Sequence, residues 1–410
     1  MPVTQCAILV GGLGTRLGAR ASGLPKPMVD VGGRPFLAWL LRELCRYGVE
    51  DVLLLTGHLS EVVEAALPAL VAALPRPVQL RVSREPVRAG TGGALHHAAP
   101  LLQEQFLLLN GDSLFDTPLG PLLADAPAPG MLGQLMLRQV ADASRYGVVT
   151  LEGDRITGFR PRPDPGAGSG PGVINGGVYW LDRAVLGHVG PQCSLEEDVL
   201  PRLAEAGQLR GRLAEGWFID IGVPEDLERA QTEVPRRLLR PALLLDRDGV
   251  CNVDHGWVGT RERFDWIDGA LQAITNATRR GWHVFVVTNQ SGVARGHYTE
   301  VDVQALLRWM QTEAMRAGGT IDDARYCPYH PDASVAAYRK VSAWRKPAPG
   351  MIVDVLRAWS VDACRCLLIG DQQTDLAAAA AAGVAARLFT GGNLAAAAGP
   401  WLDELGEAGR

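Results

Sequence analysis

Residues 242–249 read ALLLDRDG, a run of four apolar residues that ends in an Asp-Arg-Asp-Gly sequence. The apolar run predicts a short buried strand, and the polar sequence predicts a loop at its carboxyl end. The basic, proline-flanked stretch VPRRLLRP (residues 234–241) lies just before it. A chain of 410 residues is also longer than one ordinary domain core. We therefore predict two domains, at residues 1–235 and 241–400.

Apolar, β-rich runs alternate with helical patterns on both sides of this boundary. CAILVGG (residues 6–12) is followed by FLAWLLRELCRYG (36–48), and the later strands include GWHVFVVTNQSG (281–292) and CRCLLIGDQQTD (364–375). Such alternation is typical of βαβ units with parallel strands. We predict two α/β domains: a Rossmann-like N-terminal domain with a mixed, mainly parallel sheet, and a C-terminal domain with a parallel sheet.

The composition is that of a globular protein, with 47% hydrophobic and 21% charged residues. A net charge of −5 gives no electrostatic footprint for nucleic acid or an anionic membrane. The N-terminus lacks the pattern of a signal peptide, and the apolar runs are too short to cross a bilayer. Seven scattered cysteines favour a reducing compartment. We expect a cytoplasmic protein that binds neither nucleic acid nor membranes, and homo-oligomerisation is left open.

A glycine-rich loop, GGLGTRL (residues 11–17), follows the first predicted strand. Glycines let a nucleotide approach the backbone, whose N–H groups can then bind phosphates. Leu17 stands where a dinucleotide fingerprint has its third glycine, and no Gly-Lys-Ser/Thr of a P-loop follows. Arg16 and Lys26 would neutralise a triphosphate and the charge that develops on a pyrophosphate leaving group. A plain βα turn is the simpler alternative for the loop taken alone.

Two aspartates complete this N-terminal constellation. Asp112 follows the apolar run FLLLNG, and Asp220 lies in GWFIDIG. Mg²⁺ prefers one or two carboxylates together with substrate phosphates. The carboxyl ends of strands are the places where open α/β sheets bind ligands. We therefore predict a magnesium site at Asp112 and Asp220.

The N-terminal motifs resemble those of the sugar-1-phosphate nucleotidyltransferases. The likeness extends over residues 4–232 and rests on GGLGTRL with PKP, EPVRAGTGGAL, NGDS, INGGVYW, SLEEDVLP and FIDIGVPED. Within that family the chain most resembles the D-glycero-D-manno-heptose 1-phosphate guanylyltransferase branch. The resemblance implies that a sugar phosphate attacks the α-phosphorus of a nucleotide in line, assisted by Mg²⁺. It also implies that Asn175 and Glu196 bind the sugar.

Glu85 is the candidate for reading the base. Its carboxylate could accept hydrogen bonds from the N1–H and amino groups of guanine, a donor pair that adenine lacks, so GTP is the favoured nucleotide. Where the family commonly has Phe-x-Glu-Lys-Pro, this chain has FRPRP (residues 159–163), and Arg162 takes the place of the lysine on the sugar phosphate. Residues 161–171 are expected to form a loop. The predicted nucleotide-binding residues are Gly11, Gly12, Gly14, Thr15, Glu85, Gly90 and Thr91.

The second predicted site begins with Asp246 and Asp248. Two carboxylates at a strand end can share a divalent cation, the first acting as nucleophile and the second as acid and base. Three later segments bring complementary groups to other strand ends: TNQS (residues 288–291), Arg345 with Lys346, and Asp371 with Asp375 one helical turn later. Hydroxyl and amide donors, positive charge and a further carboxylate are what phosphate chemistry at a metal requires.

The C-terminal motifs resemble a haloacid-dehalogenase (HAD) type phosphatase, in particular the heptose 1,7-bisphosphate 7-phosphatases and their histidinol phosphatase relatives. The likeness covers residues 241–390. It implies Asp246 as nucleophile, Asp248 as proton donor, and Mg²⁺ held by Asp246, Asp371 and the backbone carbonyl of Asp248. Thr288 and Lys346 would stabilise the phosphoryl group. The implied substrate-binding residues are Asp254, His255, Gly256, Trp257, Asn289, Gln290, Ser291 and Arg345, the last near the anomeric phosphate.

The chain departs from this family at a loop that often binds zinc. The ligand pattern Cys-x-His…Cys-x-Cys corresponds here to Cys327, Tyr329, Ser342 and Trp344. A structural zinc site needs four ligands, so we expect no zinc and a loop held by packing of Tyr329 and Trp344. Gln372 also replaces a lysine that often follows the metal aspartate.

Together the two halves suggest a bifunctional enzyme that makes a nucleotide-activated heptose, with GDP-D-glycero-α-D-manno-heptose as the expected product. One alternative keeps the chemistry but changes the substrate to a hexose 1-phosphate or histidinol phosphate. Histidinol phosphate has no second phosphate for Arg345. Another alternative makes the N-terminal half a non-catalytic nucleotide-sugar sensor, although a sensor has no need of the metal carboxylates Asp112 and Asp220.

Overall fold

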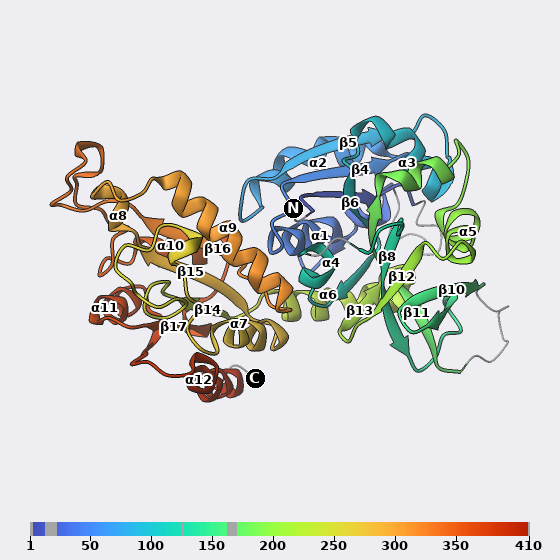
Figure 1. The fold of residues 1–410 in the computed structure, drawn as a ribbon. Helices are drawn as coiled ribbons and strands as arrows, with labels where there is room; N and C mark the ends of the chain where they lie inside the picture. The colour runs from blue at the N-terminus through green and yellow to red at the C-terminus, as the bar shows by residue number, and fades with distance from the viewer. Residues whose placement is uncertain (1–2, 13–22, 125–126, 162–169, 409–410) are drawn as a thin grey trace. The chain divides into compact units, whose positions relative to one another are not determined.

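The computed structural model describes residues 3–12, 23–124, 127–161 and 170–408. The chain forms two compact units (Figure 1): Met1–Thr117 with Asp125–Arg236, and Pro118–Ala124 with Arg237–Arg410. The main division therefore lies inside the basic, proline-flanked stretch. The short segment Pro118–Ala124, which contains helix α4 (Gly120–Ala124), belongs to the second unit, an exchange that the sequence did not suggest.

The first unit is built on a mixed sheet (Figure 1). Across the sheet the strands are β5 (Gln79–Arg84), β4 (Asp51–Thr56), β1 (Gln5–Leu9), β6 (Gln105–Asn110), β11 (Gly172–Asp182), β8 (Gly133–Val140), β12 (Leu209–Leu213), β10 (Arg155–Arg160) and β9 (Val148–Glu152). The first four are parallel to one another, and β11 pairs antiparallel with β6. Its principal helices are α1 (Phe36–Cys45), α2 (Ser60–Ala72), α3 (Gly90–Ala98), α5 (Leu200–Glu205) and α6 (Pro224–Leu238).

The strand order of the first unit reverses between β1 and β6. From β1 the chain passes to β4 and β5 on one side, and it then returns to place β6 on the other side of β1. Ligands of open α/β sheets bind outside the carboxyl ends of strands at such a reversal. Gly11 and Gly12 follow β1, and Asp112 follows β6, so the predicted nucleotide and metal residues lie at this crevice.

The second unit is built on a parallel sheet with the order β16-β15-β14-β17-β18. These strands are β16 (Asp323–Cys327), β15 (His283–Asn289), β14 (Ala242–Leu245), β17 (Cys366–Gly370) and β18 (Ala385–Leu388). The helices are α7 (Ala270–Arg279), α8 (Ser291–Ala294), α9 (Glu300–Arg316), α10 (Gly350–Ala358), α11 (Gln373–Ala381) and α12 (Leu394–Ala408). The strand order reverses between β14 and β17, which are followed directly by Asp246 and Asp371.

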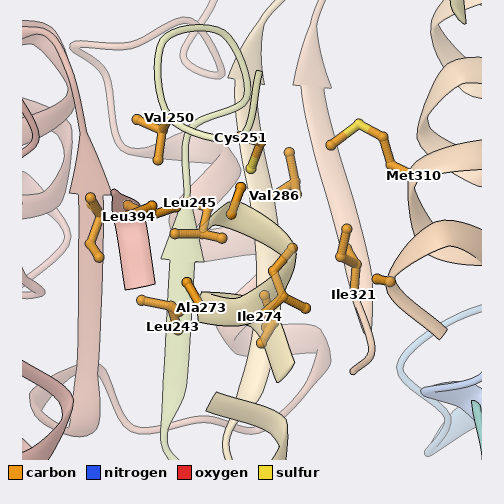
Figure 2. Packing of buried hydrophobic residues seen from close by; sticks show 14 of the residues in the cluster. Leu243, Leu245, Val250, Cys251, Ala273, Ile274, Val286, Met310, Ile321 and Leu394 are labelled. Atoms are coloured by element: carbon orange, nitrogen blue, oxygen red, sulfur yellow. The ribbon is translucent and has the colours of Figure 1, made fainter. Parts of the chain in front are cut away.

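A hydrophobic core holds this second sheet in place (Figure 2). Leu243 and Leu245 of β14 pack in one fully buried cluster with Ile274 of α7, Val286 of β15 and Met310 of α9. Burial of side chains of this size stabilises a fold by about 1.5–3 kcal/mol each. The core therefore fixes the strands whose carboxyl ends carry the polar residues of the site.

Both halves have the predicted α/β architecture, a mixed sheet in the first and a parallel sheet in the second. None of the helices in the described ranges is long and apolar enough to span a membrane.

Candidate active sites

The phosphatase candidate site is organised around the buried ammonium group of Lys346. Its Nζ lies 2.9 Å from Asp246 Oδ1 and 2.6 Å from Asp375 Oδ1, and it donates a hydrogen bond to the carbonyl of Val287 at 3.0 Å. Lys346 is 3% exposed and Asp375 is 1% exposed, so solvent hardly screens these contacts. One hydrogen bond and two ion pairs thus fix the lysine against the predicted nucleophile.

Burial and charge act in opposite directions on this cluster. Burial raises the pKa of Asp246 to about 6, although Lys346 acts to lower it, and the charge of Asp375 raises it further. Burial acts to lower the pKa of Lys346, but the charges of Asp246 and Asp375 outweigh burial and raise it. The ammonium group therefore stays charged, and a further positive charge would favour ionised Asp246.

Three carboxylates of this site fit a divalent cation. Asp246, Asp371 and Asp375 each offer an oxygen within 4.8 Å of the others. Among the described residues, the buried Asp371 Oδ1 has no hydrogen-bond partner. Such an orphaned acceptor is costly unless a ligand satisfies it. A hard cation bound by these oxygens would offset the repulsion between Asp246 and a phosphate dianion. The predicted ligands Asp246 and Asp371 are thus adjacent, and Asp375 joins them.

Asp248 lies in a separate hydrogen-bond network. The fully buried Arg247 donates through Nη2 to both carboxylate oxygens of Asp248, at 2.8 and 2.9 Å. Asn252 Nδ2 donates to Oδ1 at 3.1 Å, and Gln290 Nε2 donates to Oδ2 at 2.9 Å. Gln290 Nε2 also lies 2.9 Å from Thr288 Oγ1. The predicted proton donor is therefore oriented by three side chains and linked to the predicted phosphoryl-binding threonine.

Three further sets of predicted residues belong to this site. Asn289 pairs with the backbone of Lys346 through two hydrogen bonds of 3.1 Å, so it holds the lysine segment. The segment Asp254–Trp257 is exposed, and the Trp257 ring, 47% exposed, stacks on His297 with centroids 4.1 Å apart. Ser291 is half-buried at the start of α8. Substrate contacts by these residues stay a prediction.

The loop that corresponds to the zinc loop of the family is held partly as predicted. The Tyr329 ring lies beneath Lys340, whose Nζ is 3.7 Å from the ring centroid, and 6.0 Å from the Tyr338 ring. Trp344 is 37% exposed, and its predicted packing role stays a prediction.

The transferase candidate site is a pocket with a volume of about 290 Å³ in the first unit. Lys26 Nζ lies 3.0 Å from Asp112 Oδ2 on one side of this pocket. Asp220 is brought close by pairing of β13 (Trp217–Asp220) with β7 (Ser113–Asp116), which places it opposite Ser113. Burial raises the pKa of Asp220, and the neighbouring charge of Asp112 adds to this effect. The two predicted metal carboxylates are therefore neighbours. The pocket is lined by Leu9, Gly11, Gly12, Lys26, Pro27, Leu55, Glu85, Arg88, Gly90, Thr91, Ala94, Asn110, Gly111, Asp112 and Glu196.

The predicted sugar residues form a hydrogen-bonded cluster beside this pocket. Thr91 Oγ1 donates to Glu196 Oε2 at 2.8 Å, and Asn175 Nδ2 donates to Tyr179 Oη at 2.6 Å. Tyr179 Oη in turn donates to Glu196 Oε1 at 3.5 Å. Burial strongly raises the pKa of Tyr179, and the charge of Glu196 contributes. Tyr179 was not predicted, although its four-residue spacing from Asn175 on one strand put both on the same face.

Arg88 and Asn110 also line the pocket and were not predicted. Both lay in motifs that had been singled out, Asn110 in NGDS and Arg88 in EPVRAGTGGAL. Four predicted residues lie outside the described residues: Gly14, Thr15, Arg16 and Arg162. The predicted loop at residues 161–171 lies mostly outside them as well.

Residues 6–237, more than half of the chain, match the nucleotidyl transferase family. The chain belongs to that family. Residues 343–401 match the HAD-hydrolase-like family.

Curated relatives support the phosphatase activity of the second unit. The D-glycero-β-D-manno-heptose-1,7-bisphosphate 7-phosphatase of Rhodopseudomonas palustris is 49% identical over 152 residues, which are 37% of this chain and 84% of that protein. The protein of the same name from Escherichia coli strain K12 is 40% identical over 149 residues, 36% of this chain and 78% of that protein. Because the chain covers most of each relative, it also belongs to their phosphatase family. It is a bifunctional enzyme with phosphatase and nucleotidyltransferase activities, as the sequence predicted.

Among solved structures, HddC from Yersinia pseudotuberculosis is 28% identical to this chain, with a TM-score of 0.49. The match covers 56% of this chain and 98% of the HddC chain. A structure of the same protein complexed with GMP-PN has a TM-score of 0.48. These scores are too low for the likeness to support a function.

Gly249 offers a test of the phosphatase geometry. Its φ is +82°, and a Cβ at this position would clash with the Asp371 carboxylate. We expect Gly249→Ala to displace Asp371, to lower phosphatase kcat/KM at least about tenfold, and to destabilise the second unit by roughly 1–3 kcal/mol. Gly383→Ala is the matched control, because Gly383 has a φ of +72° and no atom within 4 Å of the added Cβ. Equal losses of activity in both variants would show that the close approach of Asp371 is unimportant.

The carboxylate trio predicts that Mg²⁺ stabilises the second unit. In an Asp112→Ala background, which removes one of the candidate ligands in the first unit, Mg²⁺ at 100 times its Kd is expected to stabilise the fold by about 2.7 kcal/mol. Asp371→Asn should abolish most of this gain, because the orphaned acceptor is replaced by an amide. Thermal unfolding with Mg²⁺ or EDTA measures the effect. A shift of the same size in the Asp371→Asn protein would place the cation elsewhere.

Proposed function

We propose that the chain makes GDP-D-glycero-D-manno-heptose in two steps. The second unit hydrolyses D-glycero-D-manno-heptose 1,7-bisphosphate at C7, giving heptose 1-phosphate and inorganic phosphate. The first unit then transfers GMP from GTP to heptose 1-phosphate, giving GDP-heptose and pyrophosphate. The observation that carries the proposal is the pair of strand-end carboxylate sites, each next to a lysine. Mg²⁺ is the proposed cation of both, held by Asp246, Asp371 and Asp375 in one and by Asp112 and Asp220 in the other.

The phosphatase step follows from the residues around Asp246. A carboxylate oxygen of Asp246 attacks the C7 phosphorus, and the P–O bond to the sugar breaks as Asp248 gives a proton to the leaving oxygen. Water, deprotonated by Asp248, then cleaves the aspartyl phosphate and regenerates Asp246. Lys346 and Thr288 stabilise charge on the phosphoryl oxygens. The identity of 49% to a heptose-bisphosphate phosphatase supports the choice of substrate.

The choice of guanine is supported by the state of Glu85. This side chain lines the transferase pocket, and its buried Oε2 has no hydrogen-bond partner in the described part of the chain. Burial raises the pKa of Glu85, with Arg88 and His97 acting to lower it. Guanine brings two donors on one edge, whereas adenine would leave a buried carboxylate unsatisfied. GTP is therefore the proposed nucleotide.

Both reactions keep the anomeric configuration at C1 of the sugar. Neither step breaks the bond between C1 and its oxygen, so the configuration of the bisphosphate persists in the nucleotide sugar. The names of the curated relatives specify the β-anomer, whereas the product expected from the sequence is the α-anomer. A fused enzyme is useful only if its two halves accept the same anomer. Assays of each step with both anomers identify it.

Separate substitutions should separate the two reactions. We expect Asp246→Asn to abolish phosphate release from heptose 1,7-bisphosphate, at least about a thousandfold, because the nucleophile is lost. The same protein should still form nucleotide sugar from heptose 1-phosphate. Asp112→Ala should show the reverse. A one-pot assay with Mg²⁺, GTP and either sugar phosphate measures both products.

Three results would contradict this proposal. If both variants retain both reactions, the site residues are wrong. If wild-type protein releases phosphate but forms no nucleotide sugar with any nucleoside triphosphate, the first unit has the alternative role of a nucleotide-sugar sensor. Phosphate release from histidinol phosphate at a higher kcat/KM than from the bisphosphate would favour the alternative substrate.

Glu85 provides a test of base selectivity. Glu85→Gln replaces one acceptor oxygen by a donor that faces the guanine N–H groups. We expect kcat/KM for GTP to fall about ten- to a hundredfold, since a hydrogen bond to a charged group contributes about 1.5–3 kcal/mol. The rate with ATP, measured in the same preparation, is the control and should stay constant or rise. An equal fall in kcat/KM for GTP and ATP would show that Glu85 has a structural role and does not select the base.

A further inference from the structure

Glu300 joins two tyrosines that are far apart in sequence. Its Oε2 accepts a hydrogen bond from Tyr326 Oη at 2.8 Å, and its Oε1 accepts one from Tyr338 Oη at 3.0 Å. Glu300 begins helix α9, Tyr326 lies in strand β16, and Tyr338 lies in the loop between β16 and α10. Both carboxylate oxygens are thus used to tie this loop to the regular structure of the second unit. Hydrogen bonds to a charged acceptor are about twice as strong as neutral ones.

Tyr338 also contacts residues on the other side of the loop. Its carbonyl accepts a hydrogen bond from the backbone N–H of His330 at 3.1 Å, and its ring lies 6.0 Å from that of Tyr329. The carbonyl of Tyr329 in turn accepts a hydrogen bond from Arg345 Nη1 at 3.4 Å. A continuous set of contacts therefore runs from Glu300 through Tyr338 and Tyr329 to the guanidinium of Arg345, the residue directly before Lys346.

Arg345 has the surroundings of an anion-binding residue. It is half-buried, and no ion pair joins it to a carboxylate anywhere in the described ranges. Burial lowers the pKa of Arg345, and the charge of Arg295 lowers it further. The same two arginines, after burial, lower the pKa of His330. The positive charges of Arg345 and Arg295 are thus concentrated around His330, and a bound anion would relieve their repulsion.

We propose that Glu300 is a positioning residue that holds Arg345 for the second phosphate of the sugar bisphosphate. The inference rests on the proposed function, because it needs a substrate that carries a phosphate at C1. The Glu300 carboxylate does not touch the substrate. It fixes the Tyr338 side of the loop, and the loop fixes the direction of the guanidinium. In this chain two tyrosines and a glutamate take the role that metal ligands have in the family pattern at this loop.

The test compares a substrate that has the second phosphate with one that lacks it. In the full-length protein, Glu300→Ala should raise KM for heptose 1,7-bisphosphate about tenfold with little change in kcat, since binding but not chemistry depends on Arg345. KM and kcat for p-nitrophenyl phosphate, which carries a single phosphate, should stay within about twofold. Tyr338→Phe should also raise KM for the bisphosphate alone, but by a smaller factor, because its ring is kept and only one hydrogen bond is lost. Glu300→Gln should be intermediate.

Glu313→Gln is the matched control on the same helix. Glu313 forms an ion pair with Arg316 at 2.7 Å on the solvent-contacting side of α9. Glu313→Gln should therefore leave KM and kcat unchanged for both substrates. A loss of activity toward both substrates in Glu300→Ala and in Tyr338→Phe would overturn the proposal, since it would show a general structural role.

Arg345→Ala separates this inference from the proposed function. If Arg345→Ala raises KM for the bisphosphate and Glu300→Ala does not, the inference is wrong while the role of Arg345 stands. If Arg345→Ala leaves KM unchanged, Arg345 does not bind the second phosphate and the inference falls with it. Phosphate release that depends on Asp246 would still support the proposed phosphatase step in that case.

Discussion

The phosphatase site depends on one buried ammonium group between two buried carboxylates. Lys346 contacts Asp246 and Asp375, and both contacts are shielded from solvent. Removal of one partner from such a buried group leaves an uncompensated charge, which costs several kcal/mol. The lysine therefore keeps two anions adjacent that would otherwise repel each other, and the site exists before any substrate arrives. The surrounding hydrophobic core, with Leu243 and Leu245 below Asp246, supplies the rigid strand that this arrangement needs.

The transferase site uses the same principle in a more open form. The side chains of Lys26 and Asp112 are 17% and 35% exposed, so water and salt weaken their attraction. A weaker ion pair would suit the predicted role of Lys26, in which the lysine exchanges its carboxylate partner for the phosphates of a nucleotide. In both units the charged cluster lies where the strand order reverses, between β1 and β6 in one and between β14 and β17 in the other. The open crevice at a reversal accommodates a ligand without disturbing the packed faces of the sheet.

The sequence was sufficient to predict what local pattern determines. Asp246 and Asp371 each follow an apolar run, and the carboxyl ends of such strands meet at one edge of a sheet, so their grouping in the second unit could be expected. Contacts between distant segments could not be predicted from the sequence. The pairing of Lys346 with Asp375, the link from Asn175 through Tyr179 to Glu196, and the hold of Glu300 on Tyr338 all depend on side-chain directions that only the folded chain fixes.

The proposed chemistry also fixes the order of the two reactions. In the bisphosphate, C1 carries a monoester with a full set of terminal oxyanions, which a half-buried guanidinium such as that of Arg345 can bind in a planar fork. After nucleotidyl transfer, the same C1 oxygen belongs to a diphosphate diester that lacks this terminal group and carries a nucleoside. A phosphatase site that draws binding energy from the C1 monoester would therefore discriminate against the nucleotide sugar. Removal of the C7 phosphate must then come first, and the product of the second unit becomes the acceptor for the first.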